Sequence, residues 1–352
     1  MISYKRAVRY AVTVTAGLVA AGSAAAGTAA AGIGPARPAR SASLTGVLAG
    51  VAARSARGAF AVGSTEANTM MILRWNGSGW TRVPSPRPTT GLLTAVATTS
   101  ATDAWAVGWT QSGAALILRW NGTTWKRAPG RGLAGDILAA VTATSARNAW
   151  AAGGNSQGAV ILHWNGTAWK QAVLPGMSLD GVVALAARDA WAVGGTAGAQ
   201  PLILRWNGTT WARVHIPGSL HATLYSVTAT SARNAWAVGQ TTAGTSLILH
   251  WNGSAWTRAT GPRLQGVLLS VAACAADSAW AVGYTSVSSL ILHWDGSTWT
   301  RVPSPSSAGA ALQSVAAPSV GAAFAVGYTS DVNPLILRWN GTTWTVQRLA
   351  AG

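Results

Sequence analysis

The hydrophobic and polar positions of this chain follow one short pattern that returns seven times. In the sixth copy the pattern forms four segments, over residues 268–273 (LLSVAA), 279–283 (AWAVG), 290–294 (LILHW) and 298–302 (TWTRV). In AWAVG the Trp and the Val fall on one side of an extended chain and the alanines on the other, which is the alternation of a β-strand. Each copy therefore predicts four short strands.

Three aromatic series mark the copies and set their period. The first series is the aromatic residue of a second-strand motif, A-W/F-A-V/A-G. The second is the Trp that ends the third strand, and the third is the Trp that begins the fourth strand after the hairpin. Together the three series hold 19 of the 20 tryptophans, and only Trp109 lies outside them. The W-N/D-G motif of the third strand has spacings of 42 to 45 residues and begins at Trp75, Trp120, Trp164, Trp206, Trp251, Trp294 and Trp339.

The Asn-Gly or Asp-Gly pair after the third strand predicts a tight hairpin. Asn-Gly suits a two-residue type I′ turn, whose central residues both need positive φ. Six of these pairs also form N-G-S/T, which is formally a glycosylation acceptor. The sixth copy carries Asp295 instead, which keeps the turn and loses the acceptor. We therefore interpret the motif as turn chemistry.

Four-stranded units of about 40–50 residues in series are typical of a β-propeller. We predict an all-β, seven-bladed propeller over residues 44–350, with four antiparallel strands in each blade. The copies are in phase from Val47 to Leu349, so we expect the first blade to pack on the last without exchanging a strand. An open stack would leave Trp-rich flanks in water, far more apolar surface than a soluble protein exposes in one patch.

The first 43 residues differ from the repeats. Lys5, Arg6 and Arg9 precede an uncharged, apolar run rich in Ala and Gly, with A-x-A sites beyond it. This order is that of a secretory signal peptide, here residues 1–31, with a linker at 32–43. A retained membrane anchor is the alternative, and the Ala and Gly content favours cleavage. We therefore expect a secreted protein with no membrane span after cleavage.

The charge of the chain does not point to nucleic acid. The formal charge is +17 because only eight acidic residues accompany 25 basic ones. Most arginines recur at fixed positions of the repeat, so they would spread around a ring rather than form the concentrated stripe that nucleic acid needs. Arg82 and its equivalents follow a Trp by two positions, where cation–π stacking is expected. The single cysteine, Cys274, excludes an internal disulfide, and we expect a monomer.

Catalytic and metal-binding groups are scarce. His163, His250 and His293 alternate with Arg at one repeat position, which indicates packing or hydrogen bonding rather than metal ligation. His215 and His221 lack a third ligand. We therefore expect no metal, no cofactor and no enzymatic activity. The alternative is an extracellular carbohydrate-active hydrolase or lyase, which would bring together loop carboxylates chosen from Glu66, Asp136, Asp180 and Asp331.

Candidate binding residues lie on the face that varies among the copies. The turns between strands one and two and between strands three and four are nearly invariant, whereas the remaining loops vary and are expected on the opposite face. Directly after the second-strand glycine come Trp109, Tyr284, Tyr328 and Gln240, and Asn155 lies in the polar loop NSQG. Aromatic rings beside amides and hydroxyls suit sugars. Alternatively, Trp109, Tyr284 and Tyr328 only fill space at the edge of the central opening of the propeller.

The motif order resembles kelch and galactose-oxidase-like propellers, in which a strand ending in Gly precedes a Trp-bearing strand. LILRWNGTTW, at residues 116–125, 202–211 and 335–344, resembles tectonin-type repeats, a group that includes lectins. A copper-radical oxidase would also need a Cys–Tyr crosslink, for which no tyrosine is set near Cys274. The resemblance implies architecture more than activity. We expect a secreted, non-enzymatic module that binds a glycan or a protein through the variable face.

Overall fold

The structure is a computed structural model that describes residues 45–128 and 135–349. The expected signal peptide and linker lie outside the described residues. Within the two described ranges, no helix is long and apolar enough to cross a bilayer.

The described chain consists of seven four-stranded sheets, here called blades 1 to 7. Blades 1 to 3 contain β1 (Gly46–Ser55), β2 (Gly58–Thr65), β3 (Met70–Trp75) and β4 (Trp80–Arg82); β5 (Leu92–Ser100), β6 (Asp103–Trp109), β7 (Ala115–Trp120) and β8 (Trp125–Arg127); and β9 (Ile137–Ser145), β10 (Asn148–Asn155), β11 (Gly158–Trp164) and β12 (Trp169–Pro175).

Blades 4 and 5 follow in the same order. They contain β13 (Met177–Ala186), β14 (Asp189–Thr196), β15 (Pro201–Trp206) and β16 (Trp211–Arg213); and β17 (Ala222–Ser231), β18 (Asn234–Thr241), β19 (Ser246–Trp251) and β20 (Trp256–Arg258).

Blades 6 and 7 complete the chain. They contain β21 (Val267–Ala275), β22 (Ser278–Tyr284), β23 (Ser289–Trp294) and β24 (Trp299–Arg301); and β25 (Ala311–Ser319), β26 (Ala322–Tyr328), β27 (Pro334–Trp339) and β28 (Trp344–Val346).

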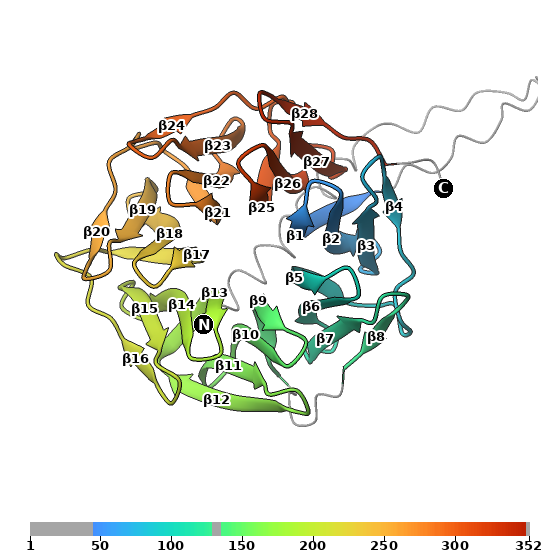
Figure 1. The fold of residues 1–352 in the computed structure, drawn as a ribbon, viewed down its shortest axis with the longest axis horizontal. Helices are drawn as coiled ribbons and strands as arrows, with labels where there is room; N and C mark the ends of the chain where they lie inside the picture. Colours follow the sequence, from blue (N-terminus) through green and yellow to red (C-terminus); the bar gives the residue numbers. More distant parts are fainter. Residues whose placement is uncertain (1–44, 129–134, 350–352) are drawn as a thin grey trace, which may run out of the picture.

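The blades stand around one axis as a wheel (Figure 1), with the first strand of each blade innermost and the fourth at the rim. Every sheet pairs its four strands in sequence order and antiparallel. The predicted all-β, seven-bladed propeller with four antiparallel strands per blade is therefore confirmed.

The glycine that ends AWAVG is required by a close approach of backbones. The inner strand of each blade carries a register shift, as between Leu48 and Gly50 against β2. A methyl group built on Gly63 would lie 1.9 Å from the carbonyl oxygen of Val47, and the equivalent glycines in the other six blades meet the same obstacle at 1.9–2.0 Å. No side chain fits there, so all seven copies keep glycine.

The tryptophans of the repeat form one aromatic triad at every blade interface. The second-strand aromatic of one blade lies against the two hairpin tryptophans of the next, with ring centroids 4.8–5.9 Å apart. Such tilted and edge-to-face pairs add to the stabilisation by burial. The triads are Phe60 with Trp120 and Trp125, Trp105 with Trp164 and Trp169, Trp150 with Trp206 and Trp211, Trp191 with Trp251 and Trp256, Trp236 with Trp294 and Trp299, Trp280 with Trp339 and Trp344, and Phe324 with Trp75 and Trp80.

The ring closes between blades 7 and 1 by the same contacts as elsewhere. Phe324 packs on Trp75 and Trp80, within one apolar cluster that also includes residues of β1 and β27. The Val51 amide donates to Ser314 Oγ at 3.2 Å across the interface. No strand is exchanged between the ends of the described chain, as the in-phase repeat predicts.

The hairpin turn after the third strand differs from the prediction. Trp75 pairs with Trp80, which leaves a four-residue loop rather than a two-residue type I′ turn. Gly77 has φ +102°, whereas Asn76 is not among the positive-φ residues. Asn76 Oδ1 accepts from the Ser78 amide, the Ser78 hydroxyl and the Gly79 amide, each at 2.9 Å. These bonds explain the N-G-S/T pattern as loop chemistry, since the hydroxyl residue itself contacts the Asn.

Asp295 builds the same loop in blade 6. Its Oδ1 accepts from the Ser297 amide and hydroxyl and from the Thr298 amide at 2.7–2.9 Å. These bonds, the Thr298 amide foremost, lower the pKa of Asp295 to about 2. The carboxylate is therefore a full substitute for the asparagine amide at this position.

A polar pair covers the aromatic triads on the face of the hairpin turns. Arg119 of β7 lies over the Trp105 ring and bonds Asp103, with Nη2 and Oδ1 3.0 Å apart. In blade 3, His163 stacks on Trp150 at 3.8 Å and shares a 2.8 Å hydrogen bond with Asn148. Blades 4 and 5 repeat these alternatives as Arg205 with Asp189 and His250 with Asn234.

The outer arginines do not take the expected stacking role. The described cation–π contacts come from third-strand arginines, such as Arg119 and Arg205, rather than from Arg82 and its fourth-strand equivalents. Arg82 is exposed. All three third-strand histidines pack on a tryptophan, and His163 and His250 also hydrogen-bond an asparagine. Burial lowers the pKa of each: His163, His250 and His293.

Candidate functional site

The two faces of the wheel differ in how constant their connections are. On one face, the link between first and second strands always has two residues and the hairpin after the third strand always has four; we call this the constant face. On the other, the link between second and third strands varies from two residues, 156–157, to five, 110–114 and 329–333. We call it the variable face. Ligand-contacting residues of repeat proteins concentrate on such a face.

All five predicted binding residues lie on the variable face, at the ends of second strands. Trp109 ends β6, Tyr284 ends β22 and Tyr328 ends β26, and each is half-buried. Blades 6 and 7 are neighbours, whereas blade 2 is separated from them by blade 1 (Figure 1). The three residues thus lie on three blades rather than in one pocket.

The two predicted amide residues hold loops in place. Gln240 Nε2 donates to the carbonyls of Gly244 at 3.2 Å and Gly266 at 3.3 Å, which joins blade 5 to the entry of blade 6. Asn155 Oδ1 accepts from the amides of Gln157 and Gly158. Their side chains therefore shape the variable face, whatever else they contact.

Asp136 is the most deeply buried acid of this region. It accepts from Asn155 Nδ2 at 2.8 Å and from Gln171 Nε2 at 3.0 Å, and only 1% of its surface is exposed. Burial raises its pKa, and the two amide bonds partly offset that rise. The carboxylate ties the start of β9 to β10 and to the rim strand β12.

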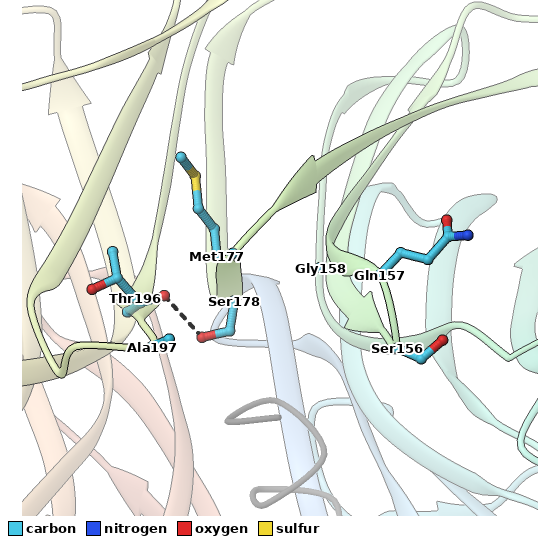
Figure 2. A pocket seen from close by; sticks show the side chains of 9 residues that line it. Ser156, Gln157, Gly158, Met177, Ser178, Thr196 and Ala197 are labelled. Atoms are coloured by element: carbon cyan, nitrogen blue, oxygen red, sulfur yellow. Dashed lines mark hydrogen bonds between the residues drawn. The ribbon is translucent and has the colours of Figure 1, made fainter.

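A polar hollow of about 130 Å³ lies between blades 3 and 4 on the variable face. It exists because β12 is unusually long and a single residue, Gly176, links it to β13. Ser156 and Gln157 border it from blade 3, and Met177, Ser178 and Thr196 from blade 4 (Figure 2). Ser178 Oγ donates to the Gly195 carbonyl at 3.1 Å. The hollow therefore combines polar side chains with the apolar Met177.

The four candidate carboxylates come from four different blades, and Asp180 lies on the inner strand β13 rather than in a loop, contrary to the expectation. Glu66 is in blade 1, Asp136 in blade 3, Asp180 in blade 4 and Asp331 in blade 7. Asp180 lines the axial channel together with inner-strand residues such as Tyr225 and Gln313. It is the only acid among the residues lining this channel, the hollow between blades 3 and 4, and a cleft between blades 1 and 2. None of these three spaces holds a pair of carboxylates, and the described residues form no group of three metal-ligating side chains.

The residues of the hollow and the Arg–Asp and His–Asn pairs were not predicted from the sequence. The pairs could have been found by comparing the seven copies. The residue at the start of the second strand is Asp in two copies that have Arg in the third strand, and Asn in two copies that have His there. The hollow could be found only from the length of the third copy's last strand, which has no counterpart in the other copies.

Comparisons with known proteins identify the fold. No family model matches the sequence, and no curated protein matches it. The structure is similar to YCF48 bound to a D1 peptide (16% identity, TM-score 0.59, 86% of this chain and 95% of the other). It is also similar to the BP39L lectin from Burkholderia pseudomallei (10%, 0.61, 86% and 99%) and to a fucose-specific lectin from Aleuria aurantia (12%, 0.52, 86% and 94%). At these identities the likeness is one of propeller fold.

Proposed function

We propose that this protein is a secreted, non-enzymatic binding module that recognises a glycan through its variable face. The observation that carries the proposal is the split between a constant framework and variable loops. A fixed scaffold that presents changing loops is the usual arrangement for binding. The repeat motifs support a kelch-like or a tectonin-like repeat.

The chemistry of the variable face suits sugars. Trp109, Tyr284 and Tyr328 offer ring faces for sugar C–H groups, and the hollow offers the exposed polar side chains of Ser156 and Gln157. At about 130 Å³ that hollow is smaller than a drug-sized pocket of roughly 300–1,000 Å³. Binding would therefore be shallow and distributed around the ring, as for a chain lying across the face. Two of the similar structures are lectins, and one is bound to a peptide, which makes a protein ligand the second candidate.

A glycan array tests the proposal with the exported chain, whose first residue we expect near position 32. Wild-type protein should retain a defined set of glycans. The Trp109→Ala, Tyr284→Ala and Tyr328→Ala variants should each weaken that binding by about 1–3 kcal/mol per lost stacking ring, since aromatic contact is the main apolar term.

Val320→Ala is the matched control, because Val320 is 60% exposed on the constant face. It should bind as wild type does. Unchanged binding in all three aromatic variants would remove these residues from the site. An array without any retained glycan, together with capture of a peptide, would replace the sugar by a protein ligand.

A further inference from the structure

A second opening lies on the constant face, away from the variable loops. It is a cleft of about 530 Å³ between blades 1 and 2. Its walls come from the β1–β2 turn, the end of β3 and the end of β5, which are adjacent in Figure 1. Neither the variable loops nor the hollow between blades 3 and 4 contributes to it.

The cleft is strongly basic. Three arginines line it, Arg54, Arg57 and Arg74, and no acidic residue does. Its other polar groups are neutral and come from Ser55, Asn76, Thr98 and Ser100. Three positive charges around one opening without a counter-charge favour an anionic occupant.

Comparison among the blades shows which group is missing. In blades 2 and 4, the third-strand arginine bonds an aspartate at the start of the second strand, as Arg119 does with Asp103. In blade 1 the arginine is present as Arg74, over the rings of Phe60 and Trp120 at 5.9 and 5.5 Å. The aspartate position is Gly58. Arg74 forms no salt bridge with any residue in the described ranges.

The missing side chain leaves usable space. A methyl group built on Gly58 would meet only Ser55 Oγ, at 3.7 Å, which is ordinary contact. Gly58 also lies in a strand and not at positive φ. The glycine is therefore not required by the backbone, unlike the glycine that ends each second strand.

Blade 1 also adds a charge where blades 2 and 3 have a hydroxyl. In blade 2, Thr99 Oγ1 donates to Asp103 Oδ2 at 2.6 Å, and in blade 3 Thr144 Oγ1 accepts from Asn148. The equivalent residue in blade 1 is Arg54. Its guanidinium donates to the Thr99 carbonyl, which holds it beside the cleft. Blade 1 thus departs from the repeat at both positions, and both changes increase the positive potential.

We propose that this cleft binds the carboxylate of a ligand, which takes the place that Asp103 and Asp189 occupy in blades 2 and 4. Guanidinium groups match carboxylates in shape and charge and bind them through paired hydrogen bonds. The ligand class is a small organic acid, either an acidic sugar such as a uronic acid or an acid without a sugar ring. Neutral groups of the cleft, Asn76 and Ser100 among them, would contact the rest of the ligand.

Titration calorimetry of the exported chain tests the site with three probes: D-glucuronate, N-acetyl-L-aspartate and D-glucose. Glucuronate should bind and glucose should not. Binding of both acids would identify a general carboxylate site, and binding of glucuronate alone an acidic-sugar site; both outcomes support the proposal. Affinity should fall as salt rises, because exposed charges are screened. Absence of binding by both acids would overturn it.

Two variants test whether glucuronate binds in the cleft. Gly58→Asp supplies the internal carboxylate, so it should abolish or weaken glucuronate binding at least tenfold while the melting temperature is retained. Arg74→Gln should weaken binding similarly. Glycan-array binding through the variable face should be unaffected in both, which separates this site from the proposed function.

Ala322→Asp is the control for charge. It introduces an aspartate at the equivalent position of blade 7, two residues before Phe324, which pairs with Arg338 of the third strand. It should leave glucuronate binding within twofold of wild type. If Ala322→Asp and Gly58→Asp weakened glucuronate binding equally, the effect would come from the overall charge of the protein, and the proposed site would be rejected.

Discussion

At the scale of single residues, two adjacent glycines of blade 4 experience different constraints. A methyl group on Gly194 would lie 1.9 Å from the Ser178 carbonyl oxygen, whereas one on Gly195 has its nearest neighbour, Thr223, at 3.6 Å. Neither glycine has positive φ. A difference in stability between alanine variants of the two glycines therefore reports the space beside the inner strand and not the conformational freedom of glycine.

Gly194→Ala should lower the free energy of unfolding by about 1–3 kcal/mol or more, because the inner strand must move to admit the methyl group. Gly195→Ala should change it by no more than about 0.5 kcal/mol. Urea unfolding followed by tryptophan fluorescence measures both. Equal effects of the two substitutions would contradict the explanation of the repeat glycine.

The sequence predicted what each residue type does more reliably than which residue it contacts. The structural role of His163 followed from its exchange with Arg among the copies, but its hydrogen-bond partner, Asn148, was not predicted. The predicted turn type of the hairpin was wrong, because it was based on the preference of Asn-Gly for two-residue loops. Here the pairing of Trp75 with Trp80 sets a four-residue loop instead.

At the scale of strands, blades 2 to 5 each carry one of two polar pairs over the same kind of aromatic triad. Arg119 of β7 pairs with a carboxylate, and His163 of β11 pairs with an amide. The pairs are matched because a half-buried guanidinium gains from a charged acceptor, whereas a neutral imidazole needs only a polar one. Mixed pairs should therefore be worse than either matched pair.

A double-mutant cycle in blade 3 tests this matching at pH 8, where the imidazole is neutral since burial lowers its pKa. Asn148→Asp and His163→Arg should each destabilise the protein. The double variant should recover stability, with a favourable coupling energy of about 0.5–3 kcal/mol. Additive effects, measured by thermal or urea unfolding, would show that the two positions vary independently.

At the scale of the whole molecule, the repeat made the architecture predictable and concealed part of the surface chemistry. Seven copies of the same strands and triads specify a closed wheel, so blade number and strand order could be derived from spacing alone. Averaging over copies hid the departures of single blades. Gly58 and Arg54 in blade 1, and the extended β12 in blade 3, are such departures, and they border two of the openings described above.

Hydrogen exchange of the chain from residue 32 onward, with and without its best array glycan, tests most directly that the variable face is the glycan-binding face. The account predicts slower exchange in variable-face loops, chiefly 110–114, 285–288 and 329–333, and unchanged exchange in the constant-face hairpins such as 76–79 and 121–124. Protection confined to the constant-face hairpins would contradict it.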